Sequence, residues 1–143
     1  MIANNWIAKH ALATILTGGA LSVLIWSRLH REWTAIETAG LLLLAPGFVL
    51  WSIARFELGA SFSLAARART LVTRGLYSKL RSPIYLFGSC VIAGTFLMLG
   101  RPAWLAVFLV IAPVQVWRAR REAAVLEAEF GDKYRAYRAS TWF

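Results

Sequence analysis

The chain has 143 residues and a mass of 15.9 kDa, with 59% hydrophobic and only 16% charged residues. Soluble domains average roughly 45–50% apolar and about 25% charged residues, so this composition excludes an ordinary soluble enzyme. The formal charge is +9, from 16 basic and 7 acidic residues. In so apolar a chain we attribute it to loops that face anionic lipid and the cytoplasm, not to nucleic-acid binding. The length fits a single domain, residues 1–143.

Four uncharged runs divide the chain, and each approaches the roughly 20 residues of a membrane-spanning helix. They predict spans at about 11–27, 38–54, 83–100 and 102–117. The last two are joined by Gly100-Arg101-Pro102 as a tight hairpin, because proline is favoured in the first turn of a helix. The predicted fold class is an all-α integral membrane protein with four transmembrane helices and a short C-terminal cytoplasmic helix.

The basic residues predict the orientation of these spans. An even number of spans places the N-terminus, the loop 55–81 and the C-terminus on one side, together with 13 of the 16 Lys and Arg residues. The other side has only Arg28, Arg31 and Arg101. By the positive-inside rule, both termini and the long loop are cytoplasmic in a multi-pass protein.

The spans argue against several functions. None of the four runs contains Asp, Glu, Lys, Arg or His, so a transporter or a proton relay is disfavoured. The two histidines, His10 and His30, lie at opposite ends of the first span, roughly 30 Å apart along a helix. We therefore predict no metal and no haem. Cys90, the single cysteine, fits a small side chain packed among apolar neighbours.

The polar chemistry is then expected in residues 55–85 and 118–143. In the first segment Gly75 and Pro83 form turns, and Leu71-Val72 suggests a short strand-like stretch. The second segment continues the fourth span as a helix that stops at Gly131. On it, Arg118 and Glu122 share one face. From the residues alone, the first segment is equally an interfacial loop with aromatic anchors, and the Arg118–Glu122 pair is either a surface ion pair or part of a pocket between helix ends.

Two motifs resemble a known family. The stretch L-V-T-R-G-L-Y-S-K-L-R-S-P-I-Y at 71–85 resembles the L-V-T-x-G-x-Y-x-x-x-R-H-P-x-Y signature of the isoprenylcysteine carboxyl methyltransferase family. Residues 118–137 are similar to its second pattern, R-x-x-x-E-E-x-x-L-x-x-x-F-G-x-x-Y-x-x-Y. The resemblance covers roughly residues 55–138, and its two motifs occur in the family's order, separated by one hydrophobic hairpin.

The resemblance implies an integral membrane methyltransferase that uses S-adenosylmethionine and methylates lipid-linked or apolar substrates. It implies a cytoplasmic cofactor pocket between the segments 69–85 and 118–138. The implied cofactor-binding residues are Thr70, Leu71, Val72, Tyr77, Arg81, Ser82, Pro83, Ile84, Tyr85 and Glu122. The implied catalytic residues are Arg118, at a position associated with the methyl acceptor, and Glu122.

The residue types suit this chemistry. A carboxylate such as Glu122 can pair with the cofactor's ammonium or ribose hydroxyls through charge-assisted hydrogen bonds. Tyrosine rings attract a sulfonium as they attract other cations. Arg118 can hold an anionic acceptor such as a carboxylate without changing protonation. An ionised carboxylate acceptor needs no general base.

The sequence departs from the family pattern at two informative positions. Ser82 replaces the His of R-H-P, and Ala123 replaces the second Glu of the E-E pair. The predicted function is methyl transfer from S-adenosylmethionine, with S-adenosylhomocysteine as product, to an apolar acceptor such as the carboxylate of a prenylated cysteine. The alternative is a non-catalytic membrane module that binds lipid or a partner. A reductase of sterol-like double bonds is disfavoured, because its nicotinamide site needs a larger chain. Acceptor identity and oligomeric state stay open.

Overall fold

The structure is a computed structural model that describes residues 2–58 and 71–142, with side chains from residue 11. Every regular element in these ranges is a helix, which confirms the predicted all-α class. The elements are α1 (Ile2–Arg28), α2 (Ala35–Leu58), the 3₁₀ helix η2 (Gly75–Ser78), α3 (Pro83–Met98), the 3₁₀ helix η3 (Pro102–Val107), α4 (Phe108–Phe130) and α5 (Asp132–Ser140).

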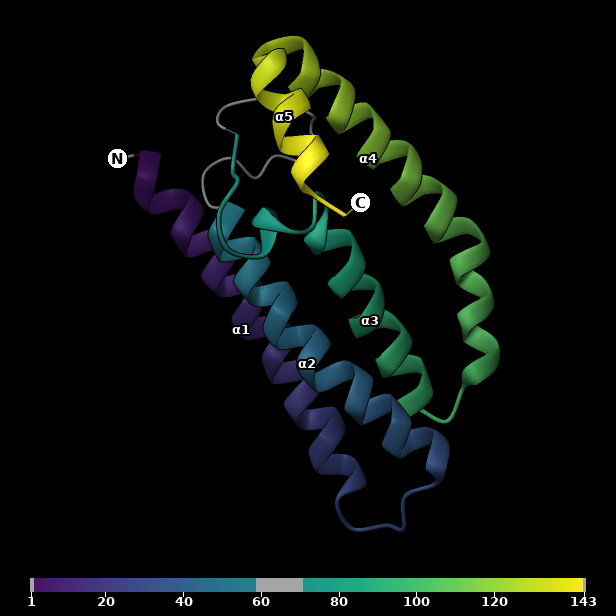
Figure 1. Ribbon diagram of the computed structural model, residues 1–143. Coiled ribbons are helices and arrows are strands. Elements are labelled where there is room, and N and C mark those ends of the chain that lie inside the picture. The colour runs from purple at the N-terminus through teal and green to yellow at the C-terminus, as the bar shows by residue number, and fades with distance from the viewer. Residues whose placement is uncertain (1, 59–70, 143) are drawn as a thin grey trace.

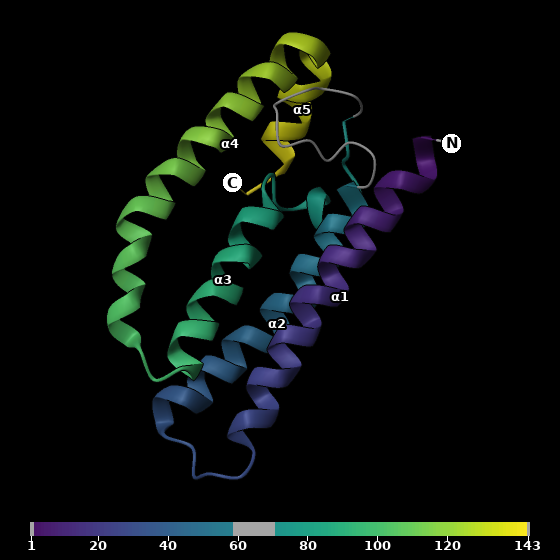
Figure 2. The same ribbon diagram turned by 180° about the vertical axis from the view of Figure 1, so that it is seen from behind.

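The four long helices form an elongated bundle, seen from two sides in Figures 1 and 2. The α1–α2 turn and the α3–η3 turn lie at one end. The start of α1, residues 71–82 and α5 lie at the other end, here called the loop end. Residues 71–82 are called the connecting segment, because they lead into α3. Both described chain ends thus lie toward the loop end, as an even number of crossings predicts.

Helices α2 and α3 pack closely because glycines remove side chains from their contact. A Cβ at Gly94 would lie 2.7 Å from the Leu44 backbone nitrogen, and one at Gly40 would lie 2.5 Å from that of Met98. Leu44 and Met98 are fully buried beside these glycines. Small residues at such positions let helix backbones approach in a membrane, where helix association depends on packing. This contact forms the core of the bundle.

A buried carboxylate ties α1 to α2 at the end opposite the loop end. Thr34 and Glu37 form a reciprocal capping box: the Thr34 N–H donates to Glu37 Oε2 at 3.0 Å, and the Glu37 N–H donates to Thr34 Oγ1 at 3.3 Å. The guanidiniums of Arg28 and Arg31 both donate to Glu37 Oε1. The charge pattern of the sequence does not reveal this cluster, because Glu37 lies just before the second uncharged run.

Three described helices are long and apolar enough to cross a membrane: Ala11–Arg28, Ala35–Leu58 and Pro102–Phe130. They coincide with the first, second and fourth predicted spans. The third predicted span, 83–100, is the shorter helix α3 of 16 residues, about 24 Å long at 1.5 Å per residue. A hydrocarbon core is about 30 Å thick, so four full-length spans are not confirmed.

The surface of the bundle carries large apolar side chains. Those exposed on α1 and on η3–α4 include Leu12, Ile15, Leu16, Val23, Trp26, Trp104, Leu109, Val110, Val114 and Trp117. Soluble monomers rarely expose contiguous apolar patches of this kind. The exposed helices therefore fit a lipid environment, in agreement with the composition.

Helix α4 continues beyond the fourth predicted span, as expected, and ends at Phe130 before Gly131. The apolar stretch ends near Trp117, and the part from Arg118 onward is charged. The expected strand-like stretch at Leu71-Val72 is not a strand. No neighbouring strand among the described residues pairs with it, and an isolated extended stretch has no ladder to join.

We predict that Gly94→Ala destabilises the protein by about 1–3 kcal/mol, because the added methyl group meets backbone atoms of α2. The measurement is thermal unfolding in detergent, followed by tryptophan fluorescence. Gly19→Ala is the matched control, since a Cβ at Gly19 meets nothing within 4 Å. Equal stability of the two variants would show that the α2–α3 contact does not need glycine.

Candidate functional site

Glu57, at the end of α2, holds the connecting segment. Its Oε2 accepts a hydrogen bond from the Leu76 backbone N–H at 2.8 Å. The neighbouring Gly75 has a φ of +58°, and a Cβ there would overlap the Glu57 carboxylate. Glycine is therefore favoured here by its backbone conformation and by the space that the carboxylate occupies. This contact fixes the start of η2 relative to α2.

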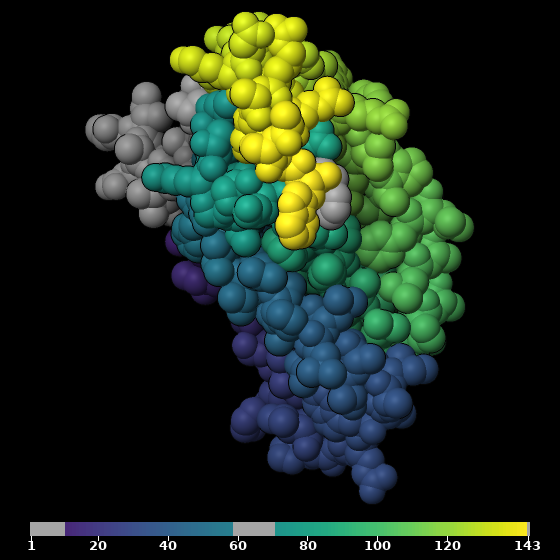
Figure 3. All heavy atoms as spheres, in the orientation of Figure 1, coloured from purple at the N-terminus to yellow at the C-terminus, as the bar shows by residue number. Residues whose placement is uncertain are grey.

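Helix α5 holds the connecting segment from the other side. The Tyr137 hydroxyl donates to the Tyr77 carbonyl oxygen at 2.6 Å, and the Trp142 N–H donates to the Lys79 carbonyl oxygen at 3.0 Å. The side chains of Tyr77, Tyr134 and Tyr137 are buried, so the two tyrosines of α5 pack inward. Figure 3 shows α5 and the C-terminal residues lying over the connecting segment. The segment is therefore clamped between α2 and α5.

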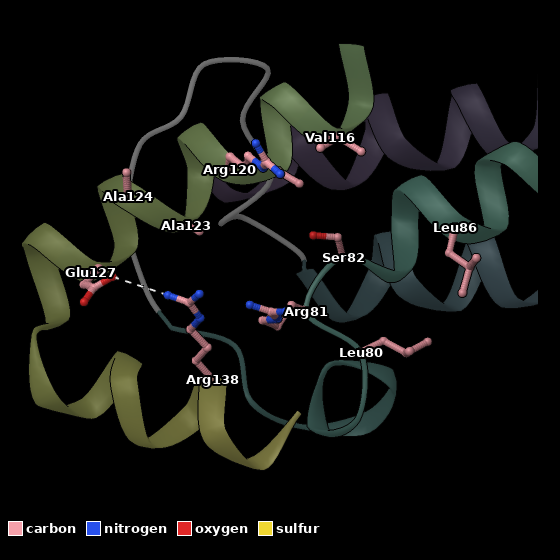
Figure 4. Close-up of a pocket in the computed structure, with 11 residues that line it drawn as sticks. Leu80, Arg81, Ser82, Leu86, Val116, Arg120, Ala123, Ala124, Glu127 and Arg138 are labelled. Atoms are coloured by element: carbon pink, nitrogen blue, oxygen red, sulfur yellow. Dashed lines mark ion pairs between the residues drawn. The ribbon is translucent and has the colours of Figure 1, made fainter. Parts of the chain in front are cut away.

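A pocket of about 700 Å³ opens between the connecting segment, α3, α4 and α5 (Figure 4). Its polar lining consists of Arg81, Ser82, Arg120, Glu127 and Arg138, and its apolar lining of Leu80, Leu86, Val116, Ala119, Ala123 and Ala124. Small-molecule pockets have volumes of about 300–1,000 Å³ and combine apolar walls with a few polar groups. This pocket lies between the two segments that the sequence predicts to carry a cofactor.

Arg81 has unused hydrogen-bonding capacity in the pocket. Its Nε is buried without a hydrogen-bond partner among the described residues. Figure 4 shows the guanidinium of Arg81 pointing toward that of Arg138, which faces Glu127 at 3.9 Å. Leaving a buried donor unpaired costs about 1–3 kcal/mol. A ligand with acceptor oxygens would remove this cost.

A second polar cluster joins α3 to α4 beside the pocket. The Tyr85 hydroxyl lies 3.5 Å from Glu122 Oε2, a long and weak hydrogen bond. The Arg118 guanidinium lies 5.9 Å from the centroid of the Tyr85 ring, within the range of a cation–π interaction. Glu122 directly precedes Ala123 of the pocket. The cluster and the pocket therefore lie on neighbouring sides of α4, about 100° apart around the helix.

Burial controls the electrostatics of this region. It raises the pKa of the Glu122 carboxyl above its ordinary value, although the Tyr85 hydroxyl and the Arg118 guanidinium lower it. Burial, and then the charge of Glu122, raise the pKa of Tyr77 well above the usual range. Burial also raises the pKa of Tyr137 to about 12. The Tyr137 hydroxyl is therefore protonated at neutral pH and can donate its hydrogen bond to the connecting segment.

The structure brings some of the predicted site residues together. Arg81 and Ser82 line the pocket, while Arg118, Glu122 and Tyr85 form the neighbouring cluster. The position at which the sequence departs from the second family motif, Ala123, also lines the pocket. Both departures, Ser82 and Ala123, thus fall in the same cavity.

Other predicted site residues lie elsewhere. Pro83 is fully buried as the first residue of α3. Four more predicted residues do not line this pocket: Leu71, Val72 and Ile84 are half-buried, and Tyr77 is buried. Thr70 lies outside the described residues. The cofactor roles of these residues stay predictions.

Several residues that build the site were not predicted from the sequence. Glu57 was read as part of a loop, and Glu127 and Arg138 were not assigned a role, although both line the pocket. Within the apolar stretches, Ser89 also donates to Gln115 at 3.1 Å and links α3 to α4. The only signal in the sequence was the i, i+4 spacing of Ala123 and Glu127, which places a carboxylate one turn after the missing Glu.

The fold and the pocket define an all-helical protein with membrane-length helices and a ligand-sized cavity at one end. A family model described as phospholipid methyltransferase matches residues 33–133, well over half of the chain. The chain belongs to the phospholipid methyltransferase family. At the family level this means transfer of a methyl group from S-adenosylmethionine to a lipid-related substrate. No curated relative and no solved structure matches the chain.

This membership supports the predicted enzyme class, a methyltransferase, and its place in a membrane. The matched range contains α2, the connecting segment and α3, together with α4, including the Arg118–Glu122 motif. The narrower resemblance to isoprenylcysteine carboxyl methyltransferases stays a prediction, as do the acceptor and the sidedness.

We predict that Tyr137→Phe lowers the free energy of unfolding by about 1–2 kcal/mol, because the buried Tyr77 carbonyl loses its donor. It should also speed tryptic cleavage after Arg74 and Lys79, which are exposed in the connecting segment. Ser78→Ala is the control, because it removes an exposed local hydrogen bond in the same turn. A cleavage rate unchanged by Tyr137→Phe would mean that α5 does not hold the segment.

Proposed function

We propose that the protein transfers a methyl group from S-adenosylmethionine to a lipid-linked or otherwise apolar acceptor at the loop end. The observation that carries the proposal is the pocket of about 700 Å³, which unites Arg81 and Ser82 of the first predicted cofactor segment with α4 and α5 of the second. Membership of the phospholipid methyltransferase family supports the same reaction class.

The pocket suits the cofactor in volume and chemistry. S-adenosylmethionine supplies a methyl group on a sulfonium and also carries an adenosine, an ammonium and a carboxylate. The alanines on α4 offer an apolar wall, while Arg81, Glu127 and Arg138 offer charges of both signs. Ligand pockets use apolar walls for most of the buried area and a few polar groups for orientation.

The cluster on the neighbouring side of α4 suits the reacting centre. In the proposal, Glu122 and the electron-rich ring of Tyr85 favour a positive charge beside the pocket. Arg118 holds an anionic group of the acceptor. A carboxylate oxygen would form the new bond to the methyl carbon as the carbon–sulfur bond breaks, and no proton would need to leave. The protein would then contribute mainly positioning and exclusion of water.

The acceptor is proposed to arrive from the bilayer. Leu86 and Val116 line the pocket and are also 42% and 50% exposed on α3 and α4. The apolar wall of the pocket therefore continues onto a surface suited to lipid. We place the loop end in the cytoplasm, since most basic residues gather there in the sequence. An acceptor that is freely water-soluble and cannot partition into lipid would argue against lateral entry.

One observation favours a second candidate, a non-catalytic module that binds lipid or a partner. The two departures from the family motifs, Ser82 and Ala123, both line the pocket. Together they remove an imidazole and a carboxylate from the position proposed for the cofactor. A folded protein without affinity for the cofactor would support this candidate.

We predict that the detergent-purified protein binds S-adenosylmethionine and S-adenosylhomocysteine with micromolar affinity in calorimetric titration. Glu122→Ala should weaken binding of S-adenosylmethionine by about tenfold or more, because the carboxylate that favours its positive sulfonium is lost. Glu129→Ala, which removes an exposed carboxylate of the same helix, should bind normally.

Activity is then measured by incubation with a labelled methyl donor and membrane lipids, followed by extraction of the labelled product. Label in an apolar product is expected. Absence of cofactor binding in a folded, lipid-supplemented sample would contradict the proposed function.

A further inference from the structure

Glu127 restores a carboxylate that the second family motif lacks here. Ala123 occupies the position of the motif's second Glu, and Glu127 follows it by four residues on the same face of α4. Both residues line the pocket. The pocket therefore contains a negative charge, displaced by one helical turn from the expected position.

The ion pair between Glu127 and Arg138 is too long and too exposed to solvent to contribute much to stability. Arg138 Nη1 lies 3.9 Å from Glu127 Oε2, and the two side chains are 56% and 40% exposed. Charge-assisted hydrogen bonds are about 2.7–2.9 Å long, and exposed pairs at longer distances add little stability. Each group can thus still bind a ligand.

Arg81 adds a second guanidinium on the same side of the pocket. It points toward Arg138 in Figure 4, and its Nε has no hydrogen-bond partner among the described residues. Two like charges that face one another repel, and an anion between them removes the repulsion. The geometry around Glu127, Arg138 and Arg81 therefore combines one site for a cation with an adjacent site for an anion.

We propose that these three residues bind the zwitterionic amino-acid end of the cofactor. Glu127 accepts hydrogen bonds from the ammonium, and Arg138 and Arg81 donate to the carboxylate. An amino-acid group carries both charges on one carbon, which matches the adjacent sites. The adenosine and the sulfur then lie against the apolar wall, toward Ala123. This inference rests on the proposed function and adds the part of the cofactor that each residue recognises.

The test compares two ligands that differ only at the amino-acid end. S-adenosylhomocysteine has this end, whereas 5′-methylthioadenosine has the same adenosine and thioether with a methyl group in its place. Calorimetric titration of Glu127→Gln and Arg138→Gln should show about tenfold or greater loss of S-adenosylhomocysteine affinity. Affinity for 5′-methylthioadenosine should stay within about twofold of the unaltered protein. Arg138→Lys, which keeps the charge, should recover part of the loss.

The controls are Glu129→Gln and Arg135→Gln, which change exposed charges on α4 and α5 outside the pocket. Both should bind the two ligands normally. An equal loss of affinity for both ligands in Glu127→Gln or Arg138→Gln would mean that the residue has a merely structural role. Unchanged affinities would mean that it has no role in binding. Either result overturns the inference while the proposed function stands. If the unaltered protein binds neither ligand, the proposed function fails and the inference fails with it.

Discussion

The structure of the loop end depends on the hydrogen bonds that the backbone of the connecting segment makes to other parts of the protein. Apart from one 3₁₀ turn, this segment has no regular structure among its described residues, so its backbone groups need partners outside the segment. Glu57 accepts from one side and Tyr137 donates from the other. Glu57 on α2 and Tyr137 on α5 are 80 residues apart in the chain. Without them, one wall of the pocket would have no fixed position.

Helix α4 has two functional surfaces, one in the pocket and one in the Arg118–Glu122–Tyr85 cluster. One side of α4 faces the pocket with alanines and Glu127, and the next side meets Tyr85 through Arg118 and Glu122. A reaction between a polar cofactor and an apolar acceptor needs access from two directions, because the two reactants come from water and from lipid. In the proposed function, α4 would therefore contact both reactants, because the pocket and the cluster lie on neighbouring sides of it.

The uncharged runs predicted the helices, and Gly131 predicted where α4 ends. The family resemblance implied that the first segment meets the C-terminal helices, and its residues 80–82 do line the pocket with α4 and α5. The run 83–100 is longer than α3, because α3 ends before Gly100, which has a φ of +68°. The uncharged runs could not reveal partners that only folding brings together. Glu57 reaches a backbone N–H 19 residues away, and Arg138 meets Glu127 because α5 folds back on α4. No local pattern marks such pairs.

The proposed function requires that the pocket beside Ala123 holds the cofactor, and a bulky side chain that fills the pocket tests this directly. Ala123→Trp places an indole in the cavity, while Ala128→Trp places the same group on an exposed part of α4. The measurement is S-adenosylhomocysteine affinity of both variants, together with their thermal unfolding to show that they fold. We expect Ala123→Trp to lose binding and Ala128→Trp to keep it. Normal binding by a folded Ala123→Trp protein would place the cofactor outside this pocket.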